Sequence, residues 1–424
     1  MPDYKKKKRN KILAPPKATK KPKKQNDNDI KMSSEQKKQY QKTNNIKVIE
    51  GRKLEKKRKF KSWVSAISVV LVLVLILQSI LPAGILVSVK NAVTMLGSGS
   101  YPITLSGSKT GVTVSRGNYY YVLSNTHLTA FSNSGKELFD YEHGFENPVL
   151  KTGAGGALVY DQGGKDLLLF DLKGFKNSLK TEKSILTANI SNSGYFAVAT
   201  DSDKYASAVT VYKNNGKSVY EWYSAEDTVN AVALSKNGKK LAVAVFNSKN
   251  GEFVSKVNVL NFKSATPEYT ETFEKTLIYN LDSAFSSYFS VITENKIKVI
   301  RWGSYKSKEY KSDYSLSVFK PYSSGYVAVF NRQSDRNDNK IAVFSKNGKL
   351  KYQVDYIGII SDIDVKGNHI YCMGNTQISM VSKDSKLVQK ADFGFGAVNI
   401  SAITTNSVLV ITDNNIEKIK LSKE

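Results

Sequence analysis

The residues that could carry out acid–base, nucleophilic or metal chemistry are few and scattered along these 424 residues. The three histidines are His127, His143 and His369, and only the first two are close in sequence. Their spacing places them on different strands, whereas a metal site needs three or four converging ligands. The sequence also lacks the G-x-S-x-G elbow of serine hydrolases. We therefore predict no catalytic residue and no metal site, and expect that the protein is not an enzyme.

Three further motifs imitate binding sites but fit structural roles better. The sole cysteine, Cys372, lies in the apolar stretch HIYCMG and is expected to be a small buried hydrophobe. The segment from Asp335 to Asn339 resembles the start of a calcium loop, but Lys340 replaces the required glycine, so we expect a polar loop between two strands. The glycine-rich stretch 153–156 precedes no helix and cannot cradle a dinucleotide phosphate. No cofactor is predicted.

Aromatic residues offer one alternative site. Tyr101 and the run Tyr119-Tyr120-Tyr121 could form a face for sugar rings. Alternating burial along a strand is the interpretation we favour.

The elements that would position such residues repeat along the chain after about residue 101. An apolar strand, a tight polar turn and an amphipathic strand recur in segments such as LTAFSNSGKELFDY (128–141), VTVYKNNGKSVYEW (209–222) and IAVFSKNGKLKYQV (341–354). Asn-Gly and Ser-Gly pairs supply the positive φ that these turns need. Looser copies begin at 167, 257, 297 and 378, and a half copy begins at 416. The copies amount to eight units.

A second repeated element is a polar turn followed by a small-residue strand, as in ISNSGYFAVAT (190–200) and LSKNGKKLAVAVF (234–246). Strands made of small side chains such as Ala and Val fit the crowded centre where several sheets converge. A period of about 40 residues with four strands per unit is typical of a β-propeller. We predict an all-β propeller of about eight four-stranded blades, with seven as the alternative count. The lone strand at 101–106 is expected to complete the last unit (397–421) and close the ring.

A long apolar segment precedes this domain. Residues 62–89 contain no charged side chain over 28 positions, which is enough for one transmembrane helix. Residues 1–61 hold 23 Lys and Arg against 6 Asp and Glu, and such flanks are cytoplasmic. We expect a disordered basic cytoplasmic tail (1–61), a transmembrane helix (62–89), a linker (90–100) and an extracytoplasmic propeller (101–424).

The tail offers several possible roles. Its lysines could contact anionic lipid, or could serve only as a topology signal. Specific nucleic-acid binding is not expected, because no aromatic or base-reading motif accompanies the charge.

The basic tail, the apolar span and motifs such as ISNSGYFAVAT and LSKNGKKLAVA resemble an uncharacterised family of membrane-anchored propellers of Gram-positive bacteria. The repeats are also similar to WD40-type propellers, although the Trp-Asp dipeptide is absent: Trp222 precedes Tyr223, and Trp302 precedes Gly303. The resemblance implies no catalytic residue.

Function is therefore argued from architecture. We expect a single-pass protein of the bacterial cell membrane whose propeller is a binding platform for an envelope protein, a peptide or a cell-wall glycan. The alternative is a surface lyase or hydrolase with carboxylates in the central channel, and a cluster of Asp, Glu, His or Arg on the inner ends of several blades would favour it. A sensor that signals to the tail is a third possibility.

Overall fold

The computed structural model describes residues 34–35, 38–39, 97–107, 109–154, 156–249 and 251–422. The chain divides into two compact units, Met1–Ile80 and Leu81–Glu424. In the first unit, the four described residues are helical and exposed. The rest of the predicted tail, the predicted span 62–89 and residues 90–96 of the linker lie outside the described residues. Among the residues that are described, we find no helix with the length and apolar character needed to cross a bilayer.

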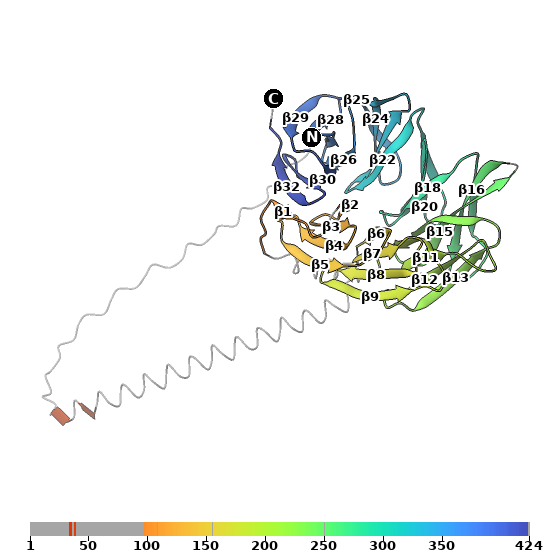
Figure 1. Ribbon diagram of the computed structural model, residues 1–424, viewed down its shortest axis with the longest axis horizontal. Coiled ribbons are helices and arrows are strands. Elements are labelled where there is room, and N and C mark those ends of the chain that lie inside the picture. The colour runs from red at the N-terminus through yellow and green to blue at the C-terminus, as the bar shows by residue number, and fades with distance from the viewer. Residues whose placement is uncertain are drawn as a thin grey trace, which may run out of the picture. The chain divides into compact units, whose positions relative to one another are not determined.

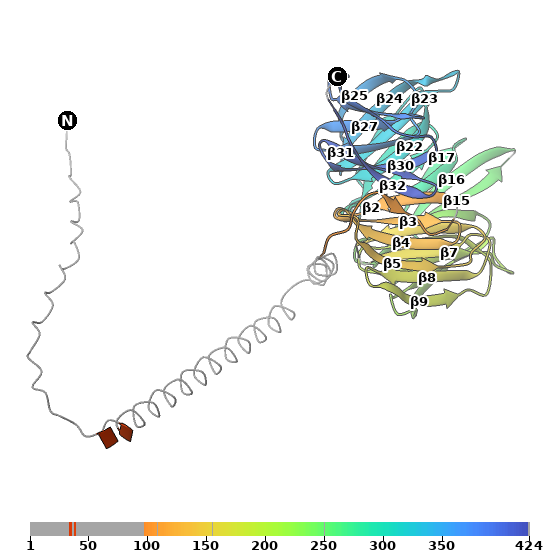
Figure 2. The same ribbon diagram turned by 60° about the vertical axis from the view of Figure 1, so that its left-hand side comes forward.

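The described part of the second unit is a ring of eight four-stranded antiparallel sheets (Figure 1). We number these blades in chain order, and within a blade the first strand is the innermost. Blade 1, residues 110–142, shows the pattern, because its four strands lie side by side in chain order in Figure 2.

The strands of the first four blades are consecutive in the chain. Blade 1 contains β2 (Thr110–Ser115), β3 (Tyr119–Ser124), β4 (His127–Ser132) and β5 (Glu137–Glu142). Blade 2 contains β6 (Pro148–Gly153), β7 (Gly156–Asp161), β8 (Asp166–Asp171) and β9 (Gly174–Lys180). Blade 3 contains β10 (Ile185–Ile190), β11 (Phe196–Thr200), β12 (Ser207–Tyr212) and β13 (Ser218–Ser224). Blade 4 contains β14 (Thr228–Leu234), β15 (Lys240–Lys249), β16 (Glu252–Asn261) and β17 (Tyr269–Glu274).

The last four blades follow the same order, except that the eighth borrows a strand. Blade 5 contains β18 (Ile278–Asp282), β19 (Tyr288–Thr293), β20 (Lys296–Arg301) and β21 (Ser307–Lys311). Blade 6 contains β22 (Ser315–Tyr322), β23 (Gly325–Arg332), β24 (Asp335–Ser345) and β25 (Leu350–Ile357). Blade 7 contains β26 (Asp362–Lys366), β27 (His369–Met373), β28 (Gln377–Ser382) and β29 (Leu387–Asp392). Blade 8 contains β30 (Ala397–Thr404), β31 (Ser407–Thr412), β32 (Asn415–Lys420) and β1 (Ile103–Thr104).

The ring closes as the sequence predicts. Strand β1 pairs with β32 through Ile103↔Ile416 and Thr104↔Asn415, and the Leu105 N–H donates to the Asn414 carbonyl at 2.7 Å. In Figure 1, β32, drawn in blue, accordingly lies beside β1, drawn in orange. The closing strand is shorter than the predicted 101–106, and the blade count is eight rather than seven.

The repeated hairpins form the third and fourth strands of the blades. Gly135, Gly216 and Gly348 adopt φ values of 86°, 81° and 79° in these turns, as the Ser-Gly and Asn-Gly pairs predict. The small-residue strands, such as β11 and β15, are the second strands of their blades rather than the innermost ones. They are buried because neighbouring blades cover both of their faces.

The core consists of eight apolar clusters among the described residues, one between each pair of neighbouring blades. Between blades 3 and 4, for example, Ala197 and Val209 pack with Val243. Each blade presents apolar side chains on both of its faces. Burial of these side chains against the two neighbouring blades stabilises the ring.

Strand direction gives the ring two distinct ends. We call one end the connection face, because it carries the blade-to-blade connections and the turns between second and third strands. The hairpin face is the opposite end, with the turns between first and second strands and between third and fourth strands.

Candidate functional site

A first group of charged side chains lies at the central channel near the hairpin face. Arg116 follows β2, Lys151 lies on β6, and Asp282 is the last residue of β18. These strands belong to blades 1, 2 and 5. Both cations lower the pKa of Asp282, so the three side chains interact across the channel.

The three groups differ in how firmly they are held. Arg116 Nε donates to Thr152 Oγ1 at 2.7 Å, and its Nη2 donates to the Thr152 carbonyl. The Lys151 ammonium has no hydrogen bond or ion pair to a described residue, and burial lowers its pKa. Burial raises the pKa of Asp282, although one carboxylate oxygen accepts the Ala284 N–H at 3.0 Å. Arg116 is thus held by hydrogen bonds, whereas Lys151 interacts with Asp282 through charge alone.

A second charged group joins blades 6, 7 and 8. Lys320 Nζ on β22 donates to both oxygens of Asp362, at 3.2 and 2.9 Å, and to the Ile400 carbonyl at 3.2 Å. Burial alone would lower the pKa of Lys320, but Asp362 and Asp364 raise it. Asp364 accepts the N–H groups of Ala402 and Val365 at 2.8 and 2.7 Å, and burial raises its pKa.

The second group is therefore structural. Asp362 also accepts the Ile400 N–H at 2.9 Å, so both of its oxygens are occupied by the blades that it joins. In the first group, among the described residues, Lys151 has no hydrogen-bond partner and one oxygen of Asp282 accepts a hydrogen bond. The two cations of this first group, Arg116 and Lys151, suit a ligand that carries an anionic group. Guanidinium and ammonium groups are hydrogen-bond donors that pair well with carboxylate and phosphate.

The connection face carries most of the exposed large apolar side chains. Eight of the eleven such residues in the described chain lie at this end. They are Val112, Tyr205, Tyr223, Phe253, Tyr279, Ile357, Ile359 and Phe395. Phe395, in the connection between blades 7 and 8, is 86% exposed. Ile357, the last residue of β25 before the connection to blade 7, is 78% exposed. Two of the eight, Tyr205 and Tyr223, contact each other with ring centroids 4.9 Å apart. Exposed apolar side chains mark a binding surface where they form a contiguous patch.

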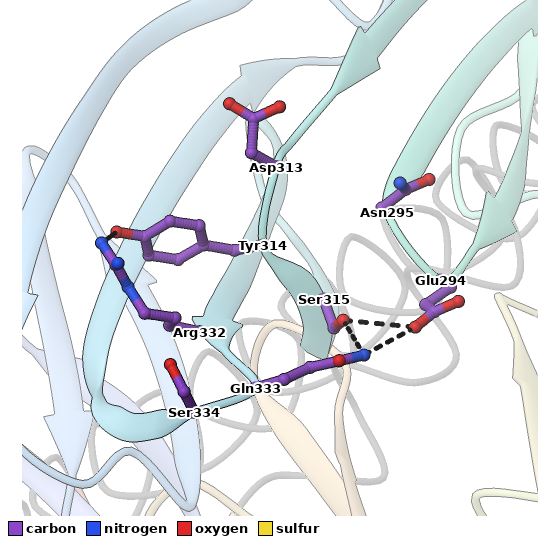
Figure 3. Close-up of a pocket in the computed structure, with 8 residues that line it drawn as sticks. All are labelled: Glu294, Asn295, Asp313, Tyr314, Ser315, Arg332, Gln333 and Ser334. Atoms are coloured by element: carbon purple, nitrogen blue, oxygen red, sulfur yellow. Dashed lines mark hydrogen bonds between the residues drawn. The ribbon is translucent and has the colours of Figure 1, made fainter.

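A polar pocket of about 460 Å³ opens on the same face between blades 5 and 6 (Figure 3). Gln333 Nε2 donates to Glu294 Oε1 at 3.1 Å and to Ser315 Oγ at 3.0 Å. On the other side, Arg332 Nη2 donates to the Tyr314 hydroxyl at 2.7 Å. The pocket thus offers both a carboxylate and a guanidinium to a polar group of a ligand.

The histidines do not meet in one site. The spacing predicts His127 and His143 on different strands. His127 does lie on β4, opposite Glu142 of β5, but His143 is the residue that follows β5 and lies on no strand. The His127 Nδ1 is 2.8 Å from Thr126 Oγ1, whereas His143 Nδ1 accepts the Phe145 N–H at 3.0 Å. Among the described residues, no group of three His, Cys, Asp or Glu side chains could hold a metal ion.

The other motifs have structural positions. Cys372 is fully buried on β27, and burial raises its pKa. The segment Asp335 to Asn339 was expected to be a loop, but it forms the start of β24, because the β23–β24 hairpin extends beyond the core with a turn at 333–334. The stretch 153–156 lies at the turn between β6 and β7.

The tyrosine run is buried rather than presented to a ligand. Tyr119, Tyr120 and Tyr121 are 7%, 0% and 0% exposed. Burial does not alternate, because β3 is an interior strand and blades 8 and 2 cover its two faces. The Tyr101 hydroxyl lies 3.3 Å from that of Tyr120.

Sequence reasoning did not identify the channel residues. A signal for them exists in Asp362-Ile363-Asp364-Val365, where charged and apolar residues alternate within a short strand. Carboxylates at alternate positions of a strand packed inside a ring indicate a face that looks into a channel. The cations that interact with the channel carboxylates come from other blades, and no pattern in their local sequence indicates that they face the channel.

Residues 98–421 match a family described as "Family of unknown function (DUF5711)". The chain belongs to this family. No curated protein matches the chain.

Three solved structures are similar to the propeller. BamB from Moraxella catarrhalis has a TM-score of 0.48 and 11% identity, with 76% of this chain and 98% of that chain covered. The Cps50 (Swd1) β-propeller domain from Myceliophteria thermophila has a TM-score of 0.45 and 10% identity, with 76% and 100% covered. Apo AztD from Citrobacter koseri has a TM-score of 0.47 and 14% identity, with 75% and 90% covered.

Proposed function

We propose that this chain is a membrane-anchored propeller of the bacterial envelope that binds a partner protein through its connection face. The observation that carries the proposal is that, of the eleven exposed large apolar residues in the described chain, eight lie at that end of the ring. Loops on a rigid scaffold are free to vary and commonly hold binding residues.

The chemistry of the connection face favours a protein over a glycan. Ile357 and Ile359 provide aliphatic contacts, which suit apolar side chains rather than sugar rings. The described turns and connections of this face hold nine Asp and Glu against five Lys and Arg. A basic rim around an apolar centre is therefore the surface expected on the partner.

Membrane anchoring rests on the sequence. The uncharged segment 62–89 is long enough to span a bilayer, and the basic flank before it favours a topology with the propeller outside the cytoplasm. A tethered propeller would hold its partner at the membrane surface.

The test is site-specific photocrosslinking of the full chain in intact cells. A benzophenone amino acid replaces Phe395 on the connection face, and the matched control replaces Leu387, which is 43% exposed on the hairpin face. We expect a light-dependent protein adduct from position 395 only, and its loss in the variant Ile357→Asp without a change in melting temperature.

Identical adducts from both positions would contradict a dedicated binding face. Adducts released only by digestion of the cell wall would identify a glycan instead. A chain recovered from the soluble fraction would overturn the anchor while leaving the binding face intact.

One observation favours the alternative of a surface enzyme. The channel does collect Arg116, Asp282, Asp362 and Asp364 on the inner parts of several blades. Asp282 is the candidate acid, because its pKa is raised and its second oxygen accepts no hydrogen bond from a described residue. If Asp282→Asn removes a hydrolytic or eliminating activity on envelope glycans while Asp362→Asn only lowers stability, the enzyme reading replaces the platform.

A further inference from the structure

The two faces of the propeller carry opposite charge. The described turns of the hairpin face hold thirteen Lys and Arg against two Asp and Glu. The connection face, as noted above, is acidic. Eleven of the thirteen hairpin-face cations are exposed, so this end of the ring is a broad basic surface.

The lysines are concentrated in pairs at the tips of three blades. Lys213 and Lys217 flank the β12–β13 turn, Lys346 and Lys349 the β24–β25 turn, and Lys383 and Lys386 the β28–β29 turn. None of these six side chains forms an ion pair with another described residue. A general need for solubility does not explain these six lysines. The turns of the connection face are about as numerous, and yet they carry net negative charge.

The chain that precedes the propeller arrives at this basic face. Gly97 accepts a hydrogen bond from Ser134 Oγ at 3.4 Å, and the Tyr101 hydroxyl donates to the Asn133 carbonyl at 3.3 Å. Gly99 approaches the Gly135 carbonyl so closely that a Cβ would lie 2.1 Å from it. Residues 133–136 form the β4–β5 turn, which belongs to the hairpin face.

The distance to a bilayer is then limited. Only residues 90–96 separate the apolar segment 62–89 from Gly97. Even fully extended, this connection spans at most about 25–30 Å at roughly 3.5 Å per residue. The face that receives the tether is therefore the one that can approach the lipid headgroups.

The hairpin face also has apolar side chains beside its cations. Phe175, Leu350 and Leu387 are 47%, 38% and 43% exposed, and each is adjacent in sequence to a lysine. Cations next to apolar side chains are the combination that binds the interface of an anionic bilayer.

We propose that the hairpin face docks on the anionic surface of the bilayer and thereby turns the connection face outward, toward the partner. This inference rests on the membrane anchor of the proposed function. It adds a second lipid contact, made by the folded propeller rather than by the tail, and assigns an orientation to the ring.

The experiment uses the full chain in lipid nanodiscs, either of neutral phosphatidylcholine or with about a third of anionic phosphatidylglycerol. An amine-reactive reagent acetylates accessible lysines, and mass spectrometry measures the rate at each one. We expect the six paired lysines to react at least about 3-fold more slowly in anionic discs, and the difference to vanish in high salt. Lys165, Lys204 and Lys275 of the connection face are internal controls and should react equally in both discs.

A variant separates docking from general crowding. Replacing Lys213, Lys217, Lys346 and Lys349 by Gln should return Lys383 and Lys386 toward their neutral-disc rates, because the remaining pair holds the face less strongly. The matched control is Lys165→Gln/Lys204→Gln, which should leave the protection unchanged.

Equal rates in both discs, or equal protection of both faces, would overturn the docking while the anchor stands. Protection in neutral discs by added soluble polyphosphate, with none from anionic lipid, would assign the face to a soluble polyanion and also overturn it. Failure of the chain to copurify with either disc would overturn the anchor itself.

Discussion

Replacing Lys320 by Met removes the single cation of the buried group that joins blades 6, 7 and 8, and leaves Asp362 and Asp364 without it. The side chains of Lys320 and Asp362 are 21% and 7% exposed, so water screens the pair poorly. Removing one partner of a buried ion pair costs about 3–5 kcal/mol, because the remaining charge is left uncompensated. The Lys320→Met variant should lose this much free energy of unfolding.

The corresponding change in melting temperature follows from the size of the domain. An unfolding entropy of about 2.1 cal/mol/K per residue, over roughly 320 residues, converts the loss into about 4–7 °C. Thermal unfolding at pH 7, followed by circular dichroism, measures it. The matched control is Lys180→Met, because Lys180 and Asp166 pair at 3.3 Å with side chains 71% and 49% exposed. Such an exposed pair contributes little, and the control should shift by less than about 1 °C.

The pH dependence has a definite sign. The pKa of Lys320 is raised in the folded protein, so its stabilisation is fully present below the unfolded value of about 10.4 and is lost as the pH rises through the folded value. The difference between wild type and Lys320→Met should therefore persist from pH 7 to about 10 and shrink above that. Adding Asp364→Asn should recover part of the loss. A shift no larger than that of the control, or a further loss on adding Asp364→Asn, would refute the ion-pair reasoning.

Three further perturbations test the ring and its core. Leu105→Ala should destabilise the closing blade by about 2–3 kcal/mol in urea unfolding, since Leu105 is 8% exposed, whereas Val112→Ala at a 41% exposed site should have little effect. Cys372 should resist iodoacetamide at pH 8 and react fully in urea, because burial raises its pKa; rapid labelling of the folded protein would contradict its position. Gly156→Ala should prevent stable folding, because a Cβ there would lie 1.9 Å from a backbone oxygen, while Gly394→Ala, with open space around it, should leave the melting temperature unchanged.

The propeller could be predicted because its repeat is local. In blades 1 to 7 the third and fourth strands form a hairpin within one short segment, with an apolar third strand. In blades 1, 3 and 6 a glycine at positive φ, Gly135, Gly216 or Gly348, lies in its turn. Eight such segments define the blade count, and the missing strand of the last unit indicates where the ring closes. Closure itself is not local, since Ile103 and Ile416 are neighbours only in the folded chain, but the orphan strand and the incomplete unit complement each other in sequence.

The candidate site depended on contacts that no local pattern describes. Thr113 N–H donates to Asn399 Oδ1 although 286 residues separate them, and Asp282 meets Arg116 and Lys151 only because blades 1, 2 and 5 surround one channel. The segment Asp335 to Asn339 was misread as a loop for the same reason, since cross-strand pairing in an extended hairpin outweighs polar composition.

The sequence by itself determined the all-β repeats, the glycine-dependent turns, the eight units and the basic flank beside an uncharged segment, because each depends on residues close together in the chain. Only the tertiary structure decided which loops share a face. Strand direction alternates within every blade, so turns far apart in sequence gather at the same end of the ring. That arrangement places the exposed apolar residues on one face, the paired lysines on the other, and the charged channel between them.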